Sequence, residues 1–240
     1  MTAALHVHPT TALAERVLLP GDPGRALLLA QALLEQPKMF NHNRGLWGYT
    51  GTAPDGAPLT IQSTGMGGPS AAIVIEELVQ LGARRLVRVG TCGALVGGFA
   101  LGDVIVAREA VCADGASRAL GAGERVAADP DLTAALEAAA ERELGQAAPS
   151  GAVVTTDLFY DPAGNHADPG AASDGHDEAV LAIEMETATL LRLGELRGVQ
   201  TACVLAVSDL LGPARGRIDP EAMDAAAQRI GRIGAAALAA

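Results

Sequence analysis

Long apolar runs are absent from this sequence of 240 residues. The longest, such as residues 71–74 and 202–207, fall far short of the roughly 20 consecutive apolar residues that a membrane-spanning helix needs. Residues 1–11 also lack the basic start and the apolar stretch of a secretory signal peptide. The sequence therefore predicts no membrane span, and we expect the protein in the cytoplasm.

Cysteine is scarce as well. The three cysteines, Cys92, Cys112 and Cys203, lie far apart within apolar segments. An odd number without paired spacing argues against a disulfide framework and against a metal site of the zinc type. We therefore expect all three to be small core residues, as free cysteines usually are.

Positive charge is also in short supply. The chain has 17 basic residues, of which only Lys38 is a lysine, against 28 acidic ones, and its formal net charge is −11 at pH 7. General binding of nucleic acid or of a membrane surface would need a basic face, so this balance disfavours both. A small anion can still be bound locally.

Apolar residues are plentiful, at 49% of the chain, which is enough to bury a large core in one domain over residues 1–240. Apolar runs of strand length alternate with amphipathic stretches of helix length, a pattern typical of α/β proteins layered around a central sheet. The expected strands are residues 16–19, 47–52, 59–63, 85–90, 103–112, 152–155 and 201–207. The expected helices are residues 23–34, 69–81, 130–143, 185–197 and 220–238.

Local signals refine these boundaries. Proline stands at or near the first turn of four expected helices, and Asp129 and Asp219 precede two of those prolines as N-caps. Residues 161–178 are dense in Gly, Asp, Pro, His and Ala without any period. They predict a mobile surface loop that could act as a lid.

Glycines concentrate where expected strands give way to helices. In an open α/β sheet, ligands sit at the carboxyl ends of strands, where backbone amides and helix N-termini face an anion. Three such junctions could share one pocket. The three clusters are Gly21 with Gly24, then Gly65 with Gly67 and Gly68, then Gly90 with Gly93.

The first cluster leads into Arg25, on the first turn of the next helix. Glycine lets the backbone approach an oxyanion, and arginine adds a forked, permanently charged donor. An ordinary turn with a solvated arginine would look the same. The second cluster, Ser63-Thr64-Gly65-Met66-Gly67-Gly68-Pro69-Ser70, matches neither the P-loop nor the dinucleotide spacing. Close backbone packing is the alternative explanation there.

Arg88 stands inside an otherwise apolar strand, in Arg88-Val89-Gly90-Thr91-Cys92-Gly93-Ala94. A charge in that position is costly to bury unless it is paired. A bound phosphate would supply the pairing, so the pattern favours a functional arginine.

Carboxylates mark two further places. Glu184 and Glu186 flank Met185, and such acceptors suit sugar hydroxyls, although acidic residues also occur at helix N-termini because of the dipole. Asp209 follows the very apolar residues 202–207. If half desolvated, it could stay protonated and act as a general acid, or it could cap the next helix.

Taken together and in this order, these motifs resemble the nucleoside phosphorylase-I family, which includes hexameric purine nucleoside phosphorylases and uridine phosphorylases. The resemblance covers nearly the whole chain. It implies a single-domain three-layer sandwich with a central mixed sheet flanked by helices, and no cofactor, with inorganic phosphate as a co-substrate. Its further landmarks are Pro20-Gly21-Asp22-Pro23, Asn43-Arg44-Gly45, Thr156-Asp157-Leu158-Phe159-Tyr160 and Ser208-Asp209.

The resemblance also implies how phosphate is held. Gly21, Arg25, Arg88 and Thr91 would bind it within one subunit. Arg44 would reach the same phosphate from the adjacent subunit. The family therefore implies a homo-oligomer, such as a hexamer, in which each pocket is completed by a neighbour.

For the sugar, the resemblance implies a site built from the acidic segment and from the N-terminus. Glu186, with Glu184, would bind the ribose hydroxyls, and Met185 would lie under the ring. A histidine from the neighbouring subunit would reach the 5′-hydroxyl. His6 matches that position, and His8 is close enough to compete.

Catalysis would then proceed through an oxocarbenium-like sugar cation, as in glycoside cleavage. The resemblance implies that Asp209 protonates the departing purine at N7, assisted by Arg217 or Arg215. The residues expected around the base are Phe159, Ile183, Ser208 and Asp209.

The nature of the base is harder to predict. Residues 63–93 are more similar to uridine phosphorylases, but residues 161–178 contain neither the Gln nor the Arg with which those enzymes read uracil. Asp209 is the acid expected of purine enzymes. We therefore expect a purine ribonucleoside or deoxyribonucleoside, with uridine or 5′-methylthioadenosine as alternatives.

Two other functions fit the same fold. A nucleosidase would use water instead of phosphate and would have no use for three arginines converging on one anion. A non-catalytic nucleoside-binding protein could dispense with Asp209 and Glu186, yet both are present.

Overall fold

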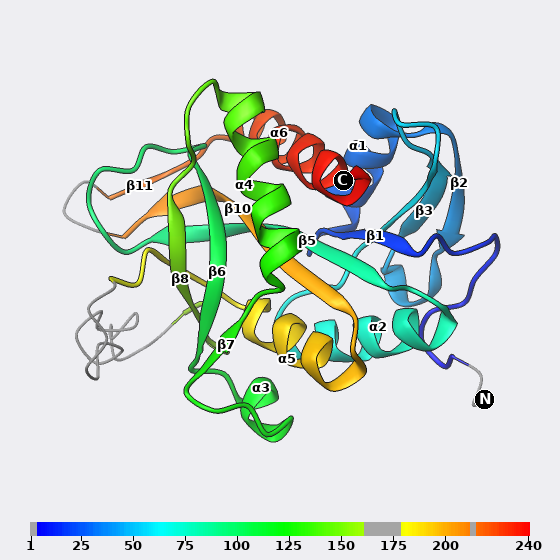
Figure 1. Cartoon of the computed structure of the whole chain (residues 1–240), viewed down its shortest axis with the longest axis horizontal. Coiled ribbons are helices and arrows are strands. Elements are labelled where there is room, and N and C mark those ends of the chain that lie inside the picture. Colours follow the sequence, from blue (N-terminus) through cyan, green and yellow to red (C-terminus); the bar gives the residue numbers. More distant parts are fainter. Residues whose placement is uncertain (1–3, 161–178, 212–214) are drawn as a thin grey trace.

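The computed structural model of the chain describes residues 4–160, 179–211 and 215–240 (Figure 1). The expected lid at residues 161–178 lies outside them. Eleven strands form one mixed sheet with helices on both faces, which confirms the expected fold class. The strands are β1 Arg16–Leu19, β2 Glu35–Asn41, β3 Gly48–Thr52, β4 Pro58–Gln62, β5 Arg85–Ala94, β6 Val104–Cys112, β7 Arg125–Ala127, β8 Ser150–Thr155, β9 Ala182–Glu184, β10 Gln200–Leu210 and β11 Gly216–Arg217. The helices are α1 Pro23–Leu33, α2 Gly68–Leu81, α3 Gly115–Ala119, α4 Pro130–Leu144, α5 Thr187–Arg197 and α6 Pro220–Ala239, with a 3₁₀ turn η1 at Asn43–Gly45.

Part of the sheet closes on itself. Strand β10 pairs in parallel with β5 and antiparallel with β6, while β8 and β9 lead from β6 back to β5. The other side of β5 pairs in parallel with β1, and the sheet continues through β4 and β3 to β2. Because β1, β5 and β10 run in the same direction, their carboxyl ends meet at one edge of the sheet.

Different helices cover the two faces of the sheet. Helices α1, α4 and α6 lie over one face and α2 and α5 over the other (Figure 1), and α5 also contributes Ala188 and Leu191 to the core under the first group. In β1, Leu18 packs with the first group of helices, whereas Val17 and Leu19 pack with the second, as the alternation of a strand requires. Gly234 of α6 lies so close to the sheet that an added Cβ would come within 2.8 Å of the Leu18 side chain. Both faces of the central strands are therefore buried, which explains their continuous apolar runs.

The predicted helix starts and core cysteines are confirmed. Asp129 and Asp219 are the N-caps of α4 and α6, and their side chains accept hydrogen bonds from backbone N–H groups of the first turn. All three cysteines are free and buried. Burial raises the pKa of the Cys203 thiol to about 12, so this sulfur stays protonated at neutral pH.

Strand β2 was not predicted. Its first five residues, from Glu35 to Met39, are exposed, so the segment shows no apolar alternation that a pattern could detect. It is a strand because it pairs antiparallel with β3 at the edge of the sheet, where Pro37 is tolerated. The pairing comes from tertiary structure.

The third glycine cluster does not lie at a strand-to-helix junction, which corrects the sequence-based expectation. Strand β5 continues through Gly90 and Gly93 to Ala94, and no helix follows it directly. A Cβ on Gly90 would come within 2.6 Å of the Arg88 guanidinium. Gly90 therefore makes room for the side chain of Arg88, two residues earlier on the same face of the strand.

Candidate active site

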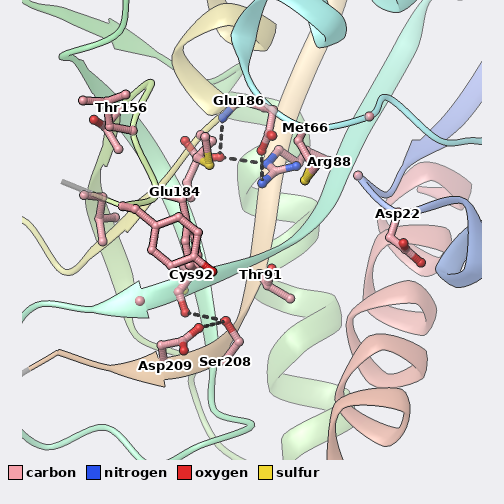
Figure 2. Close-up of a pocket in the computed structure, with 18 of the residues that line it drawn as sticks. Asp22, Met66, Arg88, Thr91, Cys92, Thr156, Glu184, Glu186, Ser208 and Asp209 are labelled. Carbon is pink, nitrogen blue, oxygen red and sulfur yellow. Dashed lines mark hydrogen bonds and ion pairs between the residues drawn. The ribbon is translucent and has the colours of Figure 1, made fainter. Parts of the chain in front are cut away.

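A pocket of about 570 Å³ opens where β1, β5 and β10 end (Figure 2). Such a volume suits a small organic ligand. The residues that line it come from all the motifs that the sequence analysis singled out except Asn43-Arg44-Gly45. They are Gly21, Asp22, Pro23, Arg25, Gly65, Met66, Arg88, Thr91, Cys92, Gly93, Thr156, Leu158, Phe159, Tyr160, Ile183, Glu184, Met185, Glu186, Ser208, Asp209, Leu211 and Arg217.

Arg88 is a buried cation of the pocket, and two carboxylates pair with it. Its Nε lies 2.9 Å from Oε2 of Glu184, and its Nη2 lies 2.6 Å from Oε2 of Glu186. Burial disfavours the charged guanidinium, but Glu186 and Glu184 outweigh it and raise the pKa of Arg88. The protein itself therefore supplies the pairing of Arg88, which corrects the expectation that a bound phosphate does so.

Glu184 is fully occupied by protein donors. Besides Arg88, its carboxylate accepts from Oγ1 of Thr155 at 2.5 Å and from the backbone N–H groups of Glu186 and Thr187, each at 2.9 Å. Its side chain has no exposed surface. Glu184 is thus placed to fix Arg88 and to satisfy the first turn of α5, which differs from the ribose contact expected from the sequence.

Glu186 sits between Arg88 and the N-terminus of α2. Its Oε1 accepts from the backbone N–H of Gly67, and Oε2 pairs with Arg88. Burial, together with the nearby Glu184 carboxylate, raises the pKa of Glu186 even though Arg88 opposes the shift. Because each carboxylate oxygen can accept more than one hydrogen bond, Glu186 keeps capacity for hydroxyl donors in the pocket.

Arg25 lies on the first turn of α1, where its backbone N–H is held by the Asp22 side chain at 2.8 Å. Within the part of the chain that the structure describes, its buried Nη1 has no hydrogen-bond partner. Burial and the charge of Arg88 lower the pKa of Arg25. A buried donor without a partner beside a second arginine indicates a missing acceptor, and an anion would supply it.

At the opposite wall of the pocket, a bulge in β10 places Ser208 and Asp209 side by side. Oγ of Ser208 lies 2.8 Å from Oδ2 of Asp209 and 3.1 Å from the carbonyl oxygen of Cys92. Arg217 stands opposite Asp209 in the antiparallel pair of β10 and β11, with its Nε 3.8 Å from Oδ1. Of the two arginines considered from the sequence, Arg217 is therefore the one beside Asp209, and Arg215 does not line the pocket.

The apolar wall is formed by Ile183, Met185 and residues 158–160. The rings of Phe159 and Tyr160 meet edge to face with centroids 4.9 Å apart, and Phe159 is 49% exposed. Oδ2 of Asp157 accepts from the backbone N–H of Gly115 at 2.7 Å and so ties this segment to α3. A flat heteroaromatic ring fits such a wall, because aromatic side chains prefer stacked or edge contacts.

His6, His8 and Arg44 do not line this pocket. They lie together elsewhere on the subunit, where the Asn43 side chain donates to the His6 carbonyl oxygen at 2.9 Å. The N-terminal segment runs beside α2, at the end of the molecule opposite β11 (Figure 1). Arg44 is exposed and has a left-handed backbone, with φ 57°, which is uncommon for a residue other than glycine.

Several lining residues were not assigned a role from the sequence. Gly65 and Met66 were part of the second glycine cluster, so that pattern already marked their place. Leu158 and Tyr160 flank Phe159 in the quoted landmark, and Leu211 shows no signal that distinguishes it from a core leucine. Except for Leu211, these residues could have been found only through their place within a quoted motif.

Among residues 4–160, 179–211 and 215–240, no group of three or more His, Cys, Asp or Glu side chains is arranged to hold a metal ion. The helices within the same ranges include none that is long and apolar enough to cross a membrane.

The chain matches the sequence model of the phosphorylase superfamily over residues 15–239. It is 39% identical over 211 residues, 86% of each chain, to a DeoD-type purine nucleoside phosphorylase of Geobacillus kaustophilus (strain HTA426). It is 41% identical over 202 residues, 82% of each chain, to a protein of the same name from Bacillus cereus (strain ZK / E33L). A third protein of that name, from Caldanaerobacter subterraneus subsp. tengcongensis, is 37% identical over 201 residues, which cover 83% of this chain and 84% of that one.

Proposed function

The chain belongs to the phosphorylase superfamily, and from this premise we propose that it cleaves the N-glycosidic bond of purine ribonucleosides or deoxyribonucleosides with inorganic phosphate. The products are the free base and the sugar 1-phosphate. The observation that carries the proposal is the unpartnered, buried Nη1 of Arg25 beside Arg88 in a pocket that also holds Asp209. The relatives named purine nucleoside phosphorylase support the choice of base.

Phosphate binds at the arginine end of the pocket. Arg25 and Arg88 present charged N–H groups that suit oxyanions in a forked arrangement. Gly21 lines the pocket next to the backbone of Gly65, since an added Cβ on Gly21 would lie 3.3 Å from the carbonyl oxygen of Gly65. Without a side chain, Gly21 lets the phosphate come close to the backbone. Thr91 lines the same pocket and adds a hydroxyl donor. The anion relieves the repulsion between the two arginines.

The sugar lies between phosphate and base. Glu186 accepts the ribose hydroxyls, and Met185 lies under the ring. Glu184 acts through Arg88, because its oxygens already accept from four protein groups. No metal or organic cofactor is part of this proposal, since phosphate itself is the nucleophile.

In the reaction, a phosphate oxygen forms a bond to C1′ while the bond from C1′ to the purine nitrogen breaks, and its electron pair goes to the base. The sugar passes through an oxocarbenium-like state, which the phosphate charge and Glu186 stabilise. Asp209 donates a proton to N7 of the leaving base, which lies against Phe159, Ile183 and Ser208. Arg217, 3.8 Å away, stabilises the Asp209 carboxylate that results.

The test is to incubate the protein with inosine, adenosine, guanosine, uridine and 5′-methylthioadenosine, with and without phosphate, and to measure base and sugar 1-phosphate. We expect phosphate-dependent release from the purine nucleosides. Equal rates in phosphate-free buffer would identify a nucleosidase, and binding without turnover would identify a nucleoside-binding protein. Cleavage of uridine alone would overturn the role of Asp209.

We further propose that the protein works as a homo-oligomer in which Arg44 and His6 complete the pocket of a neighbouring subunit, as in a hexamer built from such pairs. Both residues lie outside their own subunit's pocket. They are joined through Asn43, so a neighbour would receive both together. The unusual left-handed backbone of Arg44 is the kind of local strain that persists at functional positions.

Mixing subunits of two impaired variants tests whether Arg44 acts in the pocket of a neighbouring subunit. We expect the Arg44→Ala and Asp209→Asn variants each to be impaired alone. An equal mixture of the two, allowed to exchange subunits, should regain activity. In a two-fold pair about a quarter of the pockets would then contain both native residues. Activity of the mixture is compared with the mean of the two separate variants.

The control mixture combines Asp209→Asn with Arg25→Met, two residues that line the same subunit's pocket. No exchanged pocket would contain both native residues, so no activity should return. A first mixture that regains no more activity than the control would rule out the neighbour's role.

A further inference from the structure

Glu77 of α2 holds the N-terminal segment through an unusual number of hydrogen bonds. The residue is 8% exposed, and its carboxylate accepts from the backbone N–H groups of Leu5 at 3.0 Å, His6 at 2.9 Å and Val7 at 2.7 Å. Its Oε1 also lies 2.7 Å from Nδ1 of the His6 ring. The segment before β1 is therefore anchored to the helix by one side chain.

These contacts decide which nitrogen of His6 carries the proton. Burial opposes ionisation of Glu77, but the hydrogen bonds from Val7, His6 and Leu5 outweigh it and lower the pKa of the carboxyl group. An ionised carboxylate can only accept, so Nδ1 must be the donor. In the neutral ring, Nε2 then bears the lone pair, and within the described residues it makes no hydrogen bond.

We propose that Glu77 is a positioning residue that acts through His6 and gives the completed pocket its preference for nucleosides with a free 5′-hydroxyl. A ring fixed in this tautomer presents an acceptor, which a hydroxyl can satisfy by donating. A 5′-deoxy or 5′-methylthio group has no hydrogen to donate and leaves the nitrogen unpaired. The inference rests on the proposed function and on the delivery of His6 to a neighbouring pocket.

The same contacts separate His6 from His8. His6 is held on one side by Glu77 and on the other by Asn43, which links it to the turn that carries Arg44. His8 is exposed, and its Nε2 lies 3.1 Å from the carbonyl oxygen of Leu5. His6 is thus the ring with a fixed orientation and a free nitrogen, as a selective contact requires.

The experiment compares Glu77→Gln with the wild type in the intact oligomer. An amide that replaces Oε1 donates to Nδ1 and moves the ring proton to Nε2. A hydroxyl can also accept from Nε2–H, but the ring has then lost the ionised carboxylate that holds its orientation, so we expect the ratio of kcat/KM for adenosine to that for 5′-deoxyadenosine to fall about threefold. Nitrogen NMR of the His6 ring should show the change of tautomer.

Glu76→Gln is the matched control. Glu76 precedes Glu77 on the same helix but pairs with Arg197 at 2.8 Å on the surface. Its substitution should leave both the ratio and the His6 tautomer unchanged. A ratio that falls equally in both variants would contradict the proposal.

A double variant shows whether Glu77 acts through His6. His6→Ala alone should lower the ratio further than Glu77→Gln does, because it removes the contact, and adding Glu77→Gln to it should change the ratio no further. If Glu77→Gln does not fold, His6→Ala still decides: an unchanged ratio overturns the inference. A wild type without phosphorolysis would refute the proposed function instead, while the NMR measurement would still test the Glu77–His6 contact.

Discussion

Replacing Asp209 with asparagine should slow the phosphorolysis of inosine and guanosine by about 10²–10⁴-fold, the usual contribution of a general acid. The loss should be much smaller for a guanosine methylated at N7, because its base is already cationic and leaves without a proton. The measurement is kcat/KM for each substrate at saturating phosphate. This contrast separates an acid from a residue that only binds the base.

The geometry supports that contrast. Ser208 and Arg217 keep the Asp209 carboxyl group facing the pocket, and asparagine has nearly the same shape, so binding should change little. The control is Asp224→Asn, an exposed aspartate on α6 that does not line the pocket. Equal losses on both substrates would argue against the acid role.

The second large effect should come from Arg88→Ala. Removing the guanidinium leaves the Glu184 and Glu186 carboxylates buried without their cation, which typically costs about 3–5 kcal/mol. The phosphate concentration needed for half-maximal rate should rise sharply as well. Urea unfolding and a phosphate titration measure the two effects on the same preparation.

Arg25→Met is the informative comparison for Arg88→Ala. Its guanidinium contributes an unpartnered donor and suffers repulsion from Arg88, so its loss should raise the phosphate requirement without lowering the free energy of unfolding. Stability should drop for Arg88→Ala alone. An unchanged phosphate dependence in either variant would remove that arginine from the phosphate site.

The elements that could be predicted from the sequence are those whose pattern is local. Strands β1 and β6 contain the apolar runs of residues 17–19 and 104–107, and helices such as α4 begin with an aspartate and a proline. Strands β2, β7, β9 and β11 lack such a pattern. Strand β2 is largely exposed at the edge of the sheet, and only two or three residues make up each of β7, β9 and β11. Their existence depends on partners far away in the chain, which no local period records.

The site shows the same division. The sequence identified the arginines and carboxylates as candidates, but it did not predict which arginine pairs with which carboxylate. Arg88 and Glu184 are 96 residues apart, and only the pairing of β9 with β5 brings them together. Likewise, Glu77 looked like one more acidic residue on a helix, since its four donors come from an irregular N-terminal segment.

The partial closure of the sheet also bears on solubility. Within the described residues, the strands left with an unpaired side are β11, β7 and β2, and the first two are only two and three residues long. A long bare strand edge invites other chains to add to it and aggregate. The long edge strand β2 carries Pro37, which cannot donate to a new strand, and Lys38, whose charge resists stacking. The single lysine of the chain, Lys38, thus lies on the longest exposed strand edge of the described residues, where its charge opposes aggregation by strand addition.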